Sequence, residues 1–365
     1  MTRLALVMIA RDEARSIGRA LASAAAVVDT MIVLDTGSAD DTRAIALSHG
    51  ARVHDFVWCD DFAAARNAAL ALSDADWNLV LDADEWLEGD LADLGPERLT
   101  AGDAFLGQVQ IGNHFDQAGD TGVSRSWLTR VLPRTVRYAG RIHEQPVSDL
   151  PHRRLDIRLG HDGYLAANRA RKIGRNETLL LRDLEATPND AYLWLQLGKE
   201  YQADERAEDA AGCFASALTL APADAPYRHA MVVRAITAFK TAGRLDDALA
   251  LAQQEIDAWE DSPDFFFAVG DLYLELATHN PTRALDELLP VALFAWKRCL
   301  EIGDRNDLDG SVAGRGGYMA AHNLAACYEV LGETALAAEY AALEARLRNA
   351  DLPQPLKPVE GSGPL

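Results

Sequence analysis

Two carboxylates spaced one residue apart follow a short apolar run in the first quarter of the chain. Residues 77–81 are largely apolar, and Asp82, Ala83 and Asp84 come directly after them. Because successive side chains of a strand point to opposite faces, Asp82 and Asp84 face the same way if the extended geometry persists through Ala83. Two hard oxygen donors facing one spot suit a divalent cation, which could in turn hold a diphosphate. Taken alone, the pattern is more typical of a solvated acidic loop.

The elements that would position this pair alternate in type along about the first 160 residues. Strands are expected at 4–9, 31–34, 52–57 and 77–81, with helices at 16–27, 40–49 and 61–72. This alternation predicts βαβ units and a parallel sheet, and ligands bind such sheets at the carboxyl ends of the strands. Asp35 at the end of the second strand and Asp82 at the end of the fourth are therefore expected on one rim.

The turn after the second strand supports a role for Asp35. Gly37 marks a tight turn, and either Ser38 or Asp40 is expected to cap the next helix by accepting from its free N–H groups. A carboxylate at position 35 is not needed to begin that helix. Asp35 is therefore a candidate for binding a ligand.

From residue 187 onward the strands give way to a helical repeat. Pro188 and Pro222 are 34 residues apart, the length of a tetratricopeptide repeat. The residues between them match the pattern W-x2-L-G-x2-Y followed by A-x3-F, at Trp194, Leu197, Gly198, Tyr201, Ala210 and Phe214. Looser copies occur near 232, 266 and 321. Because about three repeats bury a continuous core, residues 187–350 are expected to form an all-α solenoid in which Gly198 lets two helices approach closely.

The composition of the 365-residue chain excludes some functions. A net charge of −21 argues against a nucleic-acid partner, because the phosphate backbone would be repelled. The 4 cysteines show no CxxC or zinc-site spacing, which favours a reducing compartment. The apolar run at 4–10 is too short to span a bilayer and charged residues follow it, so a cytoplasmic protein without membrane insertion is expected.

Two further segments have a distinctive composition. Residues 166–186 are expected to form a linker helix with a basic cluster at Arg169, Arg171, Lys172 and Arg175. This cluster is either a solvated helix face or a surface that helps to hold a phosphate or an acidic acceptor. The tail at 351–365, which is rich in proline and glycine, is expected to be disordered.

Taken together, the strand-end motifs resemble those of the inverting family 2 glycosyltransferases of the GT-A fold. The resemblance rests on the order and spacing of four segments, 11–13 (RDE), 35–38 (DTGS), 66–67 (RN) and 82–85 (DADE). It implies an α/β, Rossmann-like GT-A domain at 1–165, followed by the tetratricopeptide solenoid. This union is similar to a bacterial subgroup that includes peptide S-glycosyltransferases of the sublancin-modifying type.

The resemblance also implies a role for each matching residue. Asp35 would accept a hydrogen bond from the N3–H of a uracil-type base, and Arg66 would lie near the base and the diphosphate. Asp82 would touch the ribose or the metal, and Asp84 would bind Mn²⁺ or Mg²⁺ directly. The residues expected to bind the nucleotide sugar are Arg11, Glu13, Asp35, Arg66, Asp82 and Ala83.

Two later motifs match the subgroup as well. The segment 141–145 (RIHEQ) looks like its Ile/Val-His-Glu motif, and Glu144 is the first candidate for the base that takes the acceptor's proton. Glu85 is the competing candidate, and His143 would orient the acceptor or Glu144. His161, in a GHDGY segment, would complete the metal shell or contact the diphosphate.

These features predict an inverting, metal-dependent hexosyl- or N-acetylhexosaminyltransferase. It would move a sugar from a UDP-sugar to a protein or peptide acceptor recruited by the repeats. In an alternative, the enzyme acts on a cell-envelope or small-molecule glycan and the repeats serve for homodimerisation. A third possibility is a tetratricopeptide scaffold with an inactive transferase domain, although the retention of Asp35, Arg66, Asp82 and Asp84 argues against it.

Overall fold

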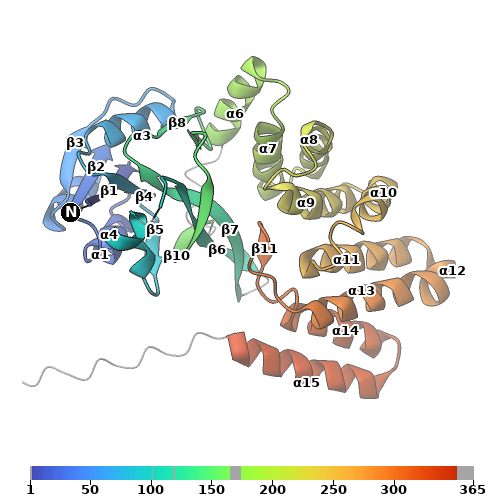
Figure 1. The fold of residues 1–365 in the computed structure, drawn as a ribbon. Coiled ribbons are helices and arrows are strands. Elements are labelled where there is room, and N and C mark those ends of the chain that lie inside the picture. Colours follow the sequence, from blue (N-terminus) through green and yellow to red (C-terminus); the bar gives the residue numbers. More distant parts are fainter. Residues whose placement is uncertain (1, 101, 118–119, 165–173, 352–365) are drawn as a thin grey trace, which may run out of the picture. The chain divides into compact units, whose positions relative to one another are not determined.

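The computed structural model describes residues 2–100, 102–117, 120–164 and 174–351 (Figure 1). The chain divides into two compact units, the first formed by Met1–Ala248 with Asn306–Val312 and the second by Leu249–Arg305 with Ala313–Leu365. This division falls within the helical half, so the domain boundaries predicted at residues 165, 186 and 350 stay predictions. The basic residues at 169, 171 and 172 and the tail beyond residue 351 lie outside the described residues.

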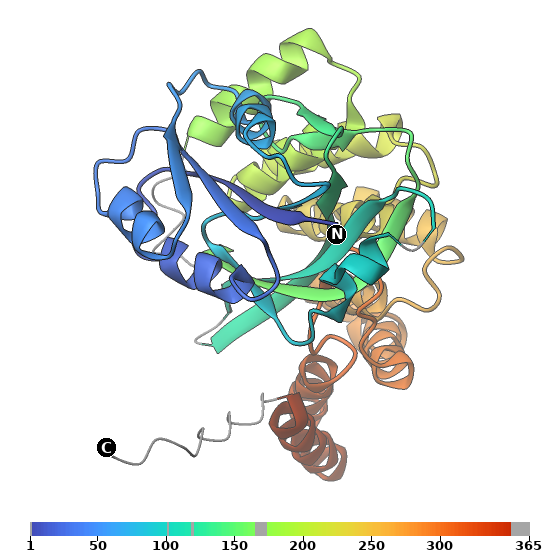
Figure 2. The same cartoon turned by 60° about the vertical axis from the view of Figure 1, so that its left-hand side comes forward.

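The first unit opens with the alternating strands and helices that the sequence predicts. Strands β1 (Leu4–Ala10), β2 (Thr30–Asp35), β3 (Arg52–Asp55) and β4 (Trp77–Val80) alternate with helices α1 (Ile17–Ala24), α2 (Thr42–Ser48) and α3 (Phe62–Ala71). β1 pairs in parallel with β2 and with β4, and β2 pairs in parallel with β3. The carboxyl ends of these four strands therefore lie at one edge of a twisted sheet (Figure 2).

Strand β1 is buried on both faces, which explains its unbroken apolar sequence. Leu6 and Met8 pack with residues of α1 and α2, whereas Ala5 and Val7 pack with Leu70 of α3. Alternate side chains of a strand point to opposite faces, so a strand covered on both sides needs an apolar residue at each position. The core of this domain is thus two apolar layers, one on each side of the parallel strands.

The sheet is extended by strands that the sequence did not predict. These are β5 (Glu85–Glu88), β6 (Leu106–Gln117), β7 (Asp120–Pro133) and β10 (His152–Tyr164), with the short β11 (Ser311–Val312) paired to β7. The order is β3-β2-β1-β4-β7-β6-β10-β5, and β7 is antiparallel to both β4 and β6. η1 (Ala92–Leu94) and α4 (Pro96–Leu99) connect β5 to β6, while β8 (Arg137–Ala139) and β9 (Gln145–Val147) pair with each other in a separate small sheet.

Helical hairpins make up the rest of the described chain. The first unit contains α6 (Arg175–Ala186), α7 (Ala191–Ala203), α8 (Ala207–Leu220), α9 (Arg228–Thr241) and the start of α10 (Leu245–Glu255). The second unit contains α11 (Pro263–His279), α12 (Pro281–Arg283), η2 (Ala284–Leu288), α13 (Leu289–Ile302), α14 (Tyr318–Val330) and α15 (Thr334–Asp351). None of the described helices combines the length and apolar character needed to cross a lipid bilayer.

The close approach predicted at Gly198 is confirmed. A Cβ atom at this position would lie 2.7 Å from the ring of Phe214, which is far inside van der Waals contact. Gly198 is on α7 and Phe214 is fully buried on α8, so the ring occupies the space that a side chain would need. The small residue and the aromatic residue of the repeat pattern therefore form one packing unit between the two helices.

The segment Asn306–Val312 belongs to the first unit, although the residues that flank it belong to the second. The N–H group of Gly310 donates to the carbonyl of Arg125 on β7 at 2.8 Å. The carbonyl of Asp309 accepts from Nδ1 of His229 on α9 at 2.7 Å. The segment therefore ties the sheet of the amino-terminal domain to α9.

Gly310→Ala is expected to lower the melting temperature, because this position is restricted in two ways. Gly310 has φ +73°, and a Cβ atom there would lie 2.5 Å from the Cβ of Ala230 on α9. The left-handed backbone costs an alanine about 1 kcal/mol and the clash adds about 1–3 kcal/mol, which together predict a fall of about 5 °C or more. Gly243→Ala is the matched control, because Gly243 has φ +74° with nothing within 4 Å. Equal shifts for the two variants would contradict the predicted clash.

Candidate functional site

The segment after β4 is a turn, which corrects one expectation from the sequence. β4 ends at Val80, and the N–H group of Glu85 donates to the carbonyl of Asp82 at 3.0 Å. The N–H group of Asp82 donates in return to the carboxylate of Glu85 at 3.0 Å. Extended geometry through Ala83, the condition under which Asp82 and Asp84 would face the same way, is therefore not met. As a result, Asp82 and Asp84 contact different partners.

Asp82 lies between two arginines from different elements. Nη2 of Arg66 on α3 is 2.5 Å from Oδ1 of Asp82, and Nη2 of Arg130 on β7 is 2.8 Å from Oδ2. Arg130 also forms an ion pair with Glu85, which is almost completely buried. Partial burial opposes ionisation of Asp82, but the two guanidinium groups outweigh it and hold the pKa of Asp82 well below its usual range. Burial raises the pKa of Glu85, against the attraction of Arg130.

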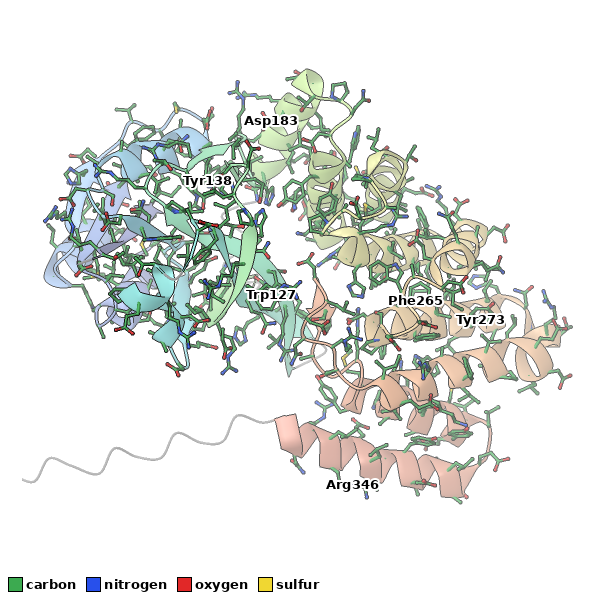
Figure 3. The ribbon with its side chains drawn as sticks, in the orientation of Figure 1. Trp127, Tyr138, Asp183, Phe265, Tyr273 and Arg346 are labelled. Carbon is green, nitrogen blue, oxygen red and sulfur yellow. The ribbon has the colours of Figure 1, made fainter. Side chains whose placement is uncertain are left out.

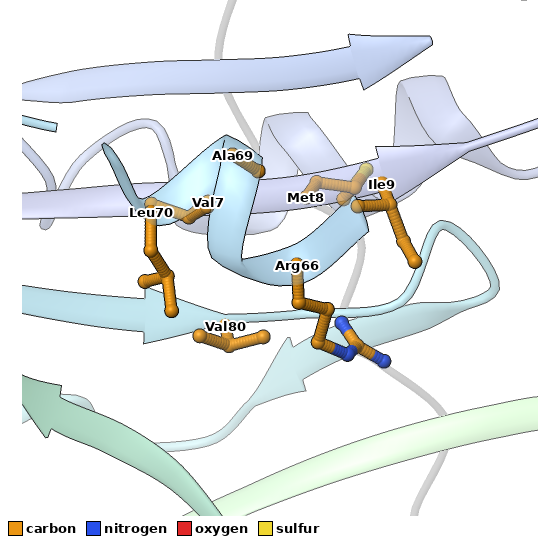
Figure 4. Close-up of a pocket in the computed structure, with 7 residues that line it drawn as sticks. All are labelled: Val7, Met8, Ile9, Arg66, Ala69, Leu70 and Val80. Carbon is orange, nitrogen blue, oxygen red and sulfur yellow. The ribbon is translucent and has the colours of Figure 1, made fainter. Parts of the chain in front are cut away.

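Arg66 connects this cluster to the loop after β8. Its Nε donates to Glu144, and both side chains are less than a tenth exposed. Burial disfavours the charged guanidinium group, but the carboxylates of Asp82 and Glu144 raise the pKa of Arg66 well above its ordinary value. Figure 4 shows the side chain extending from α3 between Val80 and Ile9. Nη1 of Arg66 is buried without a hydrogen-bond partner in the described part of the chain, so it is a donor suited to a bound anion.

Asp84 pairs with His161, which comes from β10. Oδ2 of Asp84 is 3.4 Å from Nε2 of His161. Nδ1 of His161 is 2.8 Å from the amide oxygen of Asn113, whose amide nitrogen faces the hydroxyl of Ser126 at 3.5 Å. With the amide in this orientation its oxygen can only accept, so Nδ1 donates to it and Nε2 is directed at the Asp84 carboxylate. A carboxylate oxygen and a ring nitrogen, both of which are common ligands of divalent cations, thus face each other.

This pair fits a divalent cation. Neighbouring ligands of an octahedral Mg²⁺, each about 2.1 Å from the metal, lie about 3 Å apart, which is close to the observed separation. A ligating histidine usually donates its other ring N–H to an oxygen, as His161 does to Asn113. Within the described ranges, no group of three or more His, Cys, Asp or Glu side chains has the arrangement of a metal site. A diphosphate and water are suited to supply the other ligands.

Asp35 ends β2, and only 3% of its surface is exposed. Its Oδ1 accepts from the hydroxyl of Ser38 at 2.5 Å, and its Oδ2 accepts from Nη1 of Arg43 at 3.1 Å. The backbone N–H of Ser38 also donates to both oxygens, at 3.3 and 3.2 Å. An ionised carboxylate offers about four acceptor sites, so these three donors leave capacity for one more. Asp35 is therefore a preorganised acceptor at the strand end.

The start of α2 differs from the expectation. The helix begins at Thr42 with Asp41 as the N-cap residue, and the Asp41 side chain makes no capping hydrogen bond. Ser38 instead bonds to Asp35, which explains why it does not cap the helix. Asp40 still satisfies one free donor, because its carboxylate accepts from the N–H group of Thr42 at 3.0 Å.

The loop after β1 is bound to the loop after β2. The N–H group of Asp12 donates to the hydroxyl of Ser38 at 3.0 Å, and that of Glu13 donates to the hydroxyl of Thr42 at 2.7 Å. The Arg11 side chain is about half exposed, with Nε 3.9 Å from the carboxylate of Asp12. The backbone of Asp12 and Glu13 is thus tied to Ser38, which binds Asp35, and to Thr42 at the start of α2.

The predicted catalytic residues lie in residues 140–144, which connect β8 to β9. Glu144 joins the Asp82 cluster through Arg66, and Nε2 of His143 is 3.9 Å from Oε1 of Glu200 on α7. His143 has φ +50°, which is unusual for a residue other than glycine. The structure therefore brings Glu144, Arg66 and Asp82 into direct contact. Asp84, two residues after Asp82, contacts His161 of β10 instead.

Three residues with close contacts to the site were not among the sequence candidates. Arg130 binds Asp82 and Glu85, Asn113 orients His161, and the ring of Tyr138 is 5.6 Å from the guanidinium carbon of Arg66. Burial raises the pKa of Tyr138 to about 12. The only signal for Arg130 was its place ahead of the RIHEQ segment. Asn113 carried no signal, because its pairing with His161 depends on the register of β6 and β10.

Comparison with known proteins identifies the amino-terminal part. Residues 5–115 match the family model described as glycosyl transferase family 2. The amino-terminal domain is a family 2 glycosyltransferase domain. An uncharacterized glycosyltransferase of Rickettsia felis is 39% identical over 93 residues, which is 26% of this chain and 32% of the relative.

The helical half of the chain is of the tetratricopeptide type, so the chain joins a family 2 glycosyltransferase domain to tetratricopeptide hairpins. A TPR repeat-containing protein of Synechococcus elongatus is 55% identical over 87 residues, which is 24% of this chain and 22% of that protein. The chain thus spans between a fifth and a third of the length of these two curated relatives.

Two solved structures resemble parts of the chain. The crystal structure of MamA has a TM-score of 0.39 and 16% identity, and the match covers 51% of this chain and 95% of that one. Glucosyl-3-phosphoglycerate synthase from Mycobacterium tuberculosis, in complex with Mn²⁺, UDP and glucosyl-3-phosphoglycerate, has a TM-score of 0.24 and 24% identity. That match covers 32% of this chain and 44% of the synthase chain.

Proposed function

We propose that the chain transfers a sugar from a UDP-sugar to an acceptor, with inversion at the anomeric carbon and a divalent cation bound by Asp84 and His161. The observation that carries the proposal is this pair, in which Oδ2 of Asp84 and Nε2 of His161 lie 3.4 Å apart beyond the end of β4 in a family 2 glycosyltransferase domain. Mn²⁺ or Mg²⁺ bound there would neutralise the charge that develops on the leaving nucleoside diphosphate.

The nucleotide is assigned to the strand ends beside the metal ligands. Asp35 offers its buried carboxylate to the N3–H of uracil, and the preorganised contacts to Ser38 and Arg43 hold it in place. Arg66 offers its unpartnered Nη1 to the diphosphate, where a guanidinium fork matches phosphate geometry. The other residues proposed to contact the donor are Arg11, Glu13, Asp82 and Ala83.

Glu144 is the proposed base. Arg66 binds its Oε1, and no hydrogen bond to Oε2 is found among the described residues. The competing Glu85 has both oxygens engaged, Oε1 by Arg130 and Oε2 by the N–H group of Asp82. Glu144 would take the acceptor's proton as the acceptor atom attacks the anomeric carbon and UDP leaves from the opposite face. His143 is proposed to orient the acceptor.

The acceptor is proposed to be a protein or a peptide. Stacked helical repeats present extended surfaces that suit such partners better than they suit a small molecule. Incubation with labelled UDP-sugars and peptides encoded by neighbouring genes is expected to give a peptide whose mass rises by one sugar residue. Transfer to a cell-envelope glycan with no peptide labelled would overturn this part of the proposal.

Nucleotide binding is tested most directly by thermal unfolding. UDP with Mn²⁺ at about 100 times its Kd stabilises a protein by about 2.7 kcal/mol, which predicts a melting temperature higher by about 5 °C or more. ADP with Mn²⁺ is the matched control, because Asp35 as an acceptor selects for the N3–H of uracil. The absence of a shift with UDP and Mn²⁺ would contradict the proposed function.

A further inference from the structure

The 140–145 loop, which consists of residues 140–144 and Gln145 at the start of β9, carries His143 and Glu144 and is held from two sides. On one side it contacts the glycosyltransferase domain, and on the other it contacts α6 and α7 of the helical half. We propose that Asp183 of α6 and Glu200 of α7 are positioning residues for this loop. The first helices after the glycosyltransferase domain would then be part of the catalytic apparatus as well as part of the repeat array. The inference deepens the proposed function and rests on it for the role of Glu144.

Asp183 holds the start of the loop with both carboxylate oxygens. Oδ2 accepts from the backbone N–H of Arg141 at 3.0 Å, and Oδ1 is 3.2 Å from Nε of the same residue. The Asp183 side chain is 14% exposed, which protects this bidentate contact from competition by water. Figure 3 labels Asp183 on α6 and Tyr138 on β8, the strand that leads into the loop. The carboxylate thus fixes the backbone three residues before Glu144.

Helix α7 holds the middle and the end of the loop. Oε1 of Glu200 is 3.9 Å from Nε2 of His143, and it accepts from the amide of Asn176 at 3.0 Å. The hydroxyl of Tyr192 accepts from the amide of Gln145 at 3.0 Å. Because Asn176 fixes the Glu200 carboxylate, the charge opposite His143 has a defined position.

The backbone of the loop needs such support. His143 has φ +50°, and a residue other than glycine stays in this region only when its surroundings over-determine it. The glycosyltransferase domain contributes the N–H group of Phe62, which donates to the Arg141 carbonyl at 2.8 Å, and the ion pair of Arg66 with Glu144. Asp183 and Glu200 contribute the opposing contacts. Without Asp183 and Glu200, the loop loses these contacts on the side that faces α6 and α7.

Asp35, proposed to bind the base, and the Asp84–His161 pair, proposed to bind the metal, have contacts in other elements. Asp35 is held by Ser38 and Arg43, and the Asp84–His161 pair is held by Asn113 on β6. These contacts come from the loop after β2, from α2 and from β6. Loss of the helical contacts is therefore expected to misplace the base without weakening the binding of UDP and Mn²⁺.

Asp183→Ala in the full-length chain tests this separation. Hydrogen–deuterium exchange of the amides at 142–145 is expected to accelerate about tenfold or more, since the loop loses two of its anchors. The kcat for UDP release from UDP-glucose or UDP-N-acetylglucosamine is expected to fall about tenfold or more, because a misplaced catalytic group costs rate steeply. The KM for the UDP-sugar and the UDP-with-Mn²⁺ melting shift should stay within about twofold of wild type.

Three further variants make the result specific. Glu185→Ala removes an exposed carboxylate from the same helix and should change none of these quantities. Asp183→Asn keeps an oxygen that accepts from the Arg141 N–H group, so it should recover most of the lost kcat. Glu200→Gln keeps the contact to Asn176 but removes the charge opposite His143, so it should lower kcat. This variant tests the inference independently if Asp183→Ala fails to fold.

The outcomes separate this inference from the proposed function. Unchanged exchange and kcat in Asp183→Ala and Glu200→Gln would overturn the positioning role. A parallel loss of the melting shift would also overturn it, because the contacts would then support the fold in general. If the wild-type chain neither releases UDP nor responds to UDP with Mn²⁺, the proposed function fails, while the exchange measurement still decides whether α6 and α7 hold the loop.

Discussion

Asp84→Ala is expected to abolish the rise in melting temperature that UDP with Mn²⁺ gives the wild-type chain. The variant removes one of the two side chains that face each other across 3.4 Å, and His161 alone offers a single ligand. A cation left with one protein ligand loses most of its affinity, and the diphosphate loses the charge that binds it. UDP release from the UDP-sugar should fall by about a hundredfold or more, since this charge stabilises the leaving group.

Two controls distinguish loss of the metal from loss of the fold. Asp90→Ala removes an exposed carboxylate just after β5 and should leave the melting shift intact. The ligand-free melting curve of Asp84→Ala shows directly whether the variant is folded. Addition of EDTA should bring the wild-type response to UDP down to that of Asp84→Ala. A full melting shift in Asp84→Ala would mean that the cation binds at another place or is not needed.

Strands β1, β2 and β4 could be predicted because most of their residues are buried. β1 needs apolar residues at successive positions, and this requirement leaves a continuous apolar run in the sequence. The repeat was predictable for a similar reason, because the contact of Gly198 with Phe214 needs one small and one large residue at a fixed spacing. Local requirements of this kind are visible without knowledge of the tertiary fold.

The strands β6, β7 and β10 left no such pattern. They are long and partly exposed, and polar residues such as Gln110 and Ser126 occur along them. Their pairing is set by contacts between distant segments, which a single sequence does not record. The same limit explains the site residues that were missed. Arg130 and Asn113 acquire their roles only because β7 and β6 carry them to Asp82 and His161.

The motif residues were predicted as a group, but their contacts were not. Asp82 and Asp84 follow one strand, and simple alternation predicts that they face the same way. The turn closed between Asp82 and Glu85 separates them, so that Asp82 joins Arg66 and Arg130 while Asp84 joins His161. Two carboxylates that look equivalent in the sequence thus have different charged partners in the folded chain.

Arg66→Met is expected to cause the largest loss of stability among single substitutions in the site. Arg66 and Glu144 are 7% and 8% exposed, so the variant leaves the Glu144 carboxylate buried without its partner. Breaking a buried ion pair in this way costs about 3–5 kcal/mol, which predicts a melting temperature lower by about 10 °C. Asp82 contributes less to this loss, because it is about a third exposed and keeps Arg130.

A double-mutant cycle tests whether the unpaired carboxylate is the cause of this loss. Arg66→Met with Glu144→Gln removes both charges, so the double variant should be more stable than Arg66→Met alone by about 1–3 kcal/mol. Urea unfolding of the wild type, the two single variants and the double variant gives the four free energies of unfolding. Additive losses would show that Arg66 stabilises the fold mainly through packing against Val80 and Ile9. A stabilising coupling free energy between Arg66 and Glu144 would show that the ion pair that holds Glu144 in the site also maintains the stability of the domain. A substitution of the proposed base must then be judged by its stability as well as by its rate.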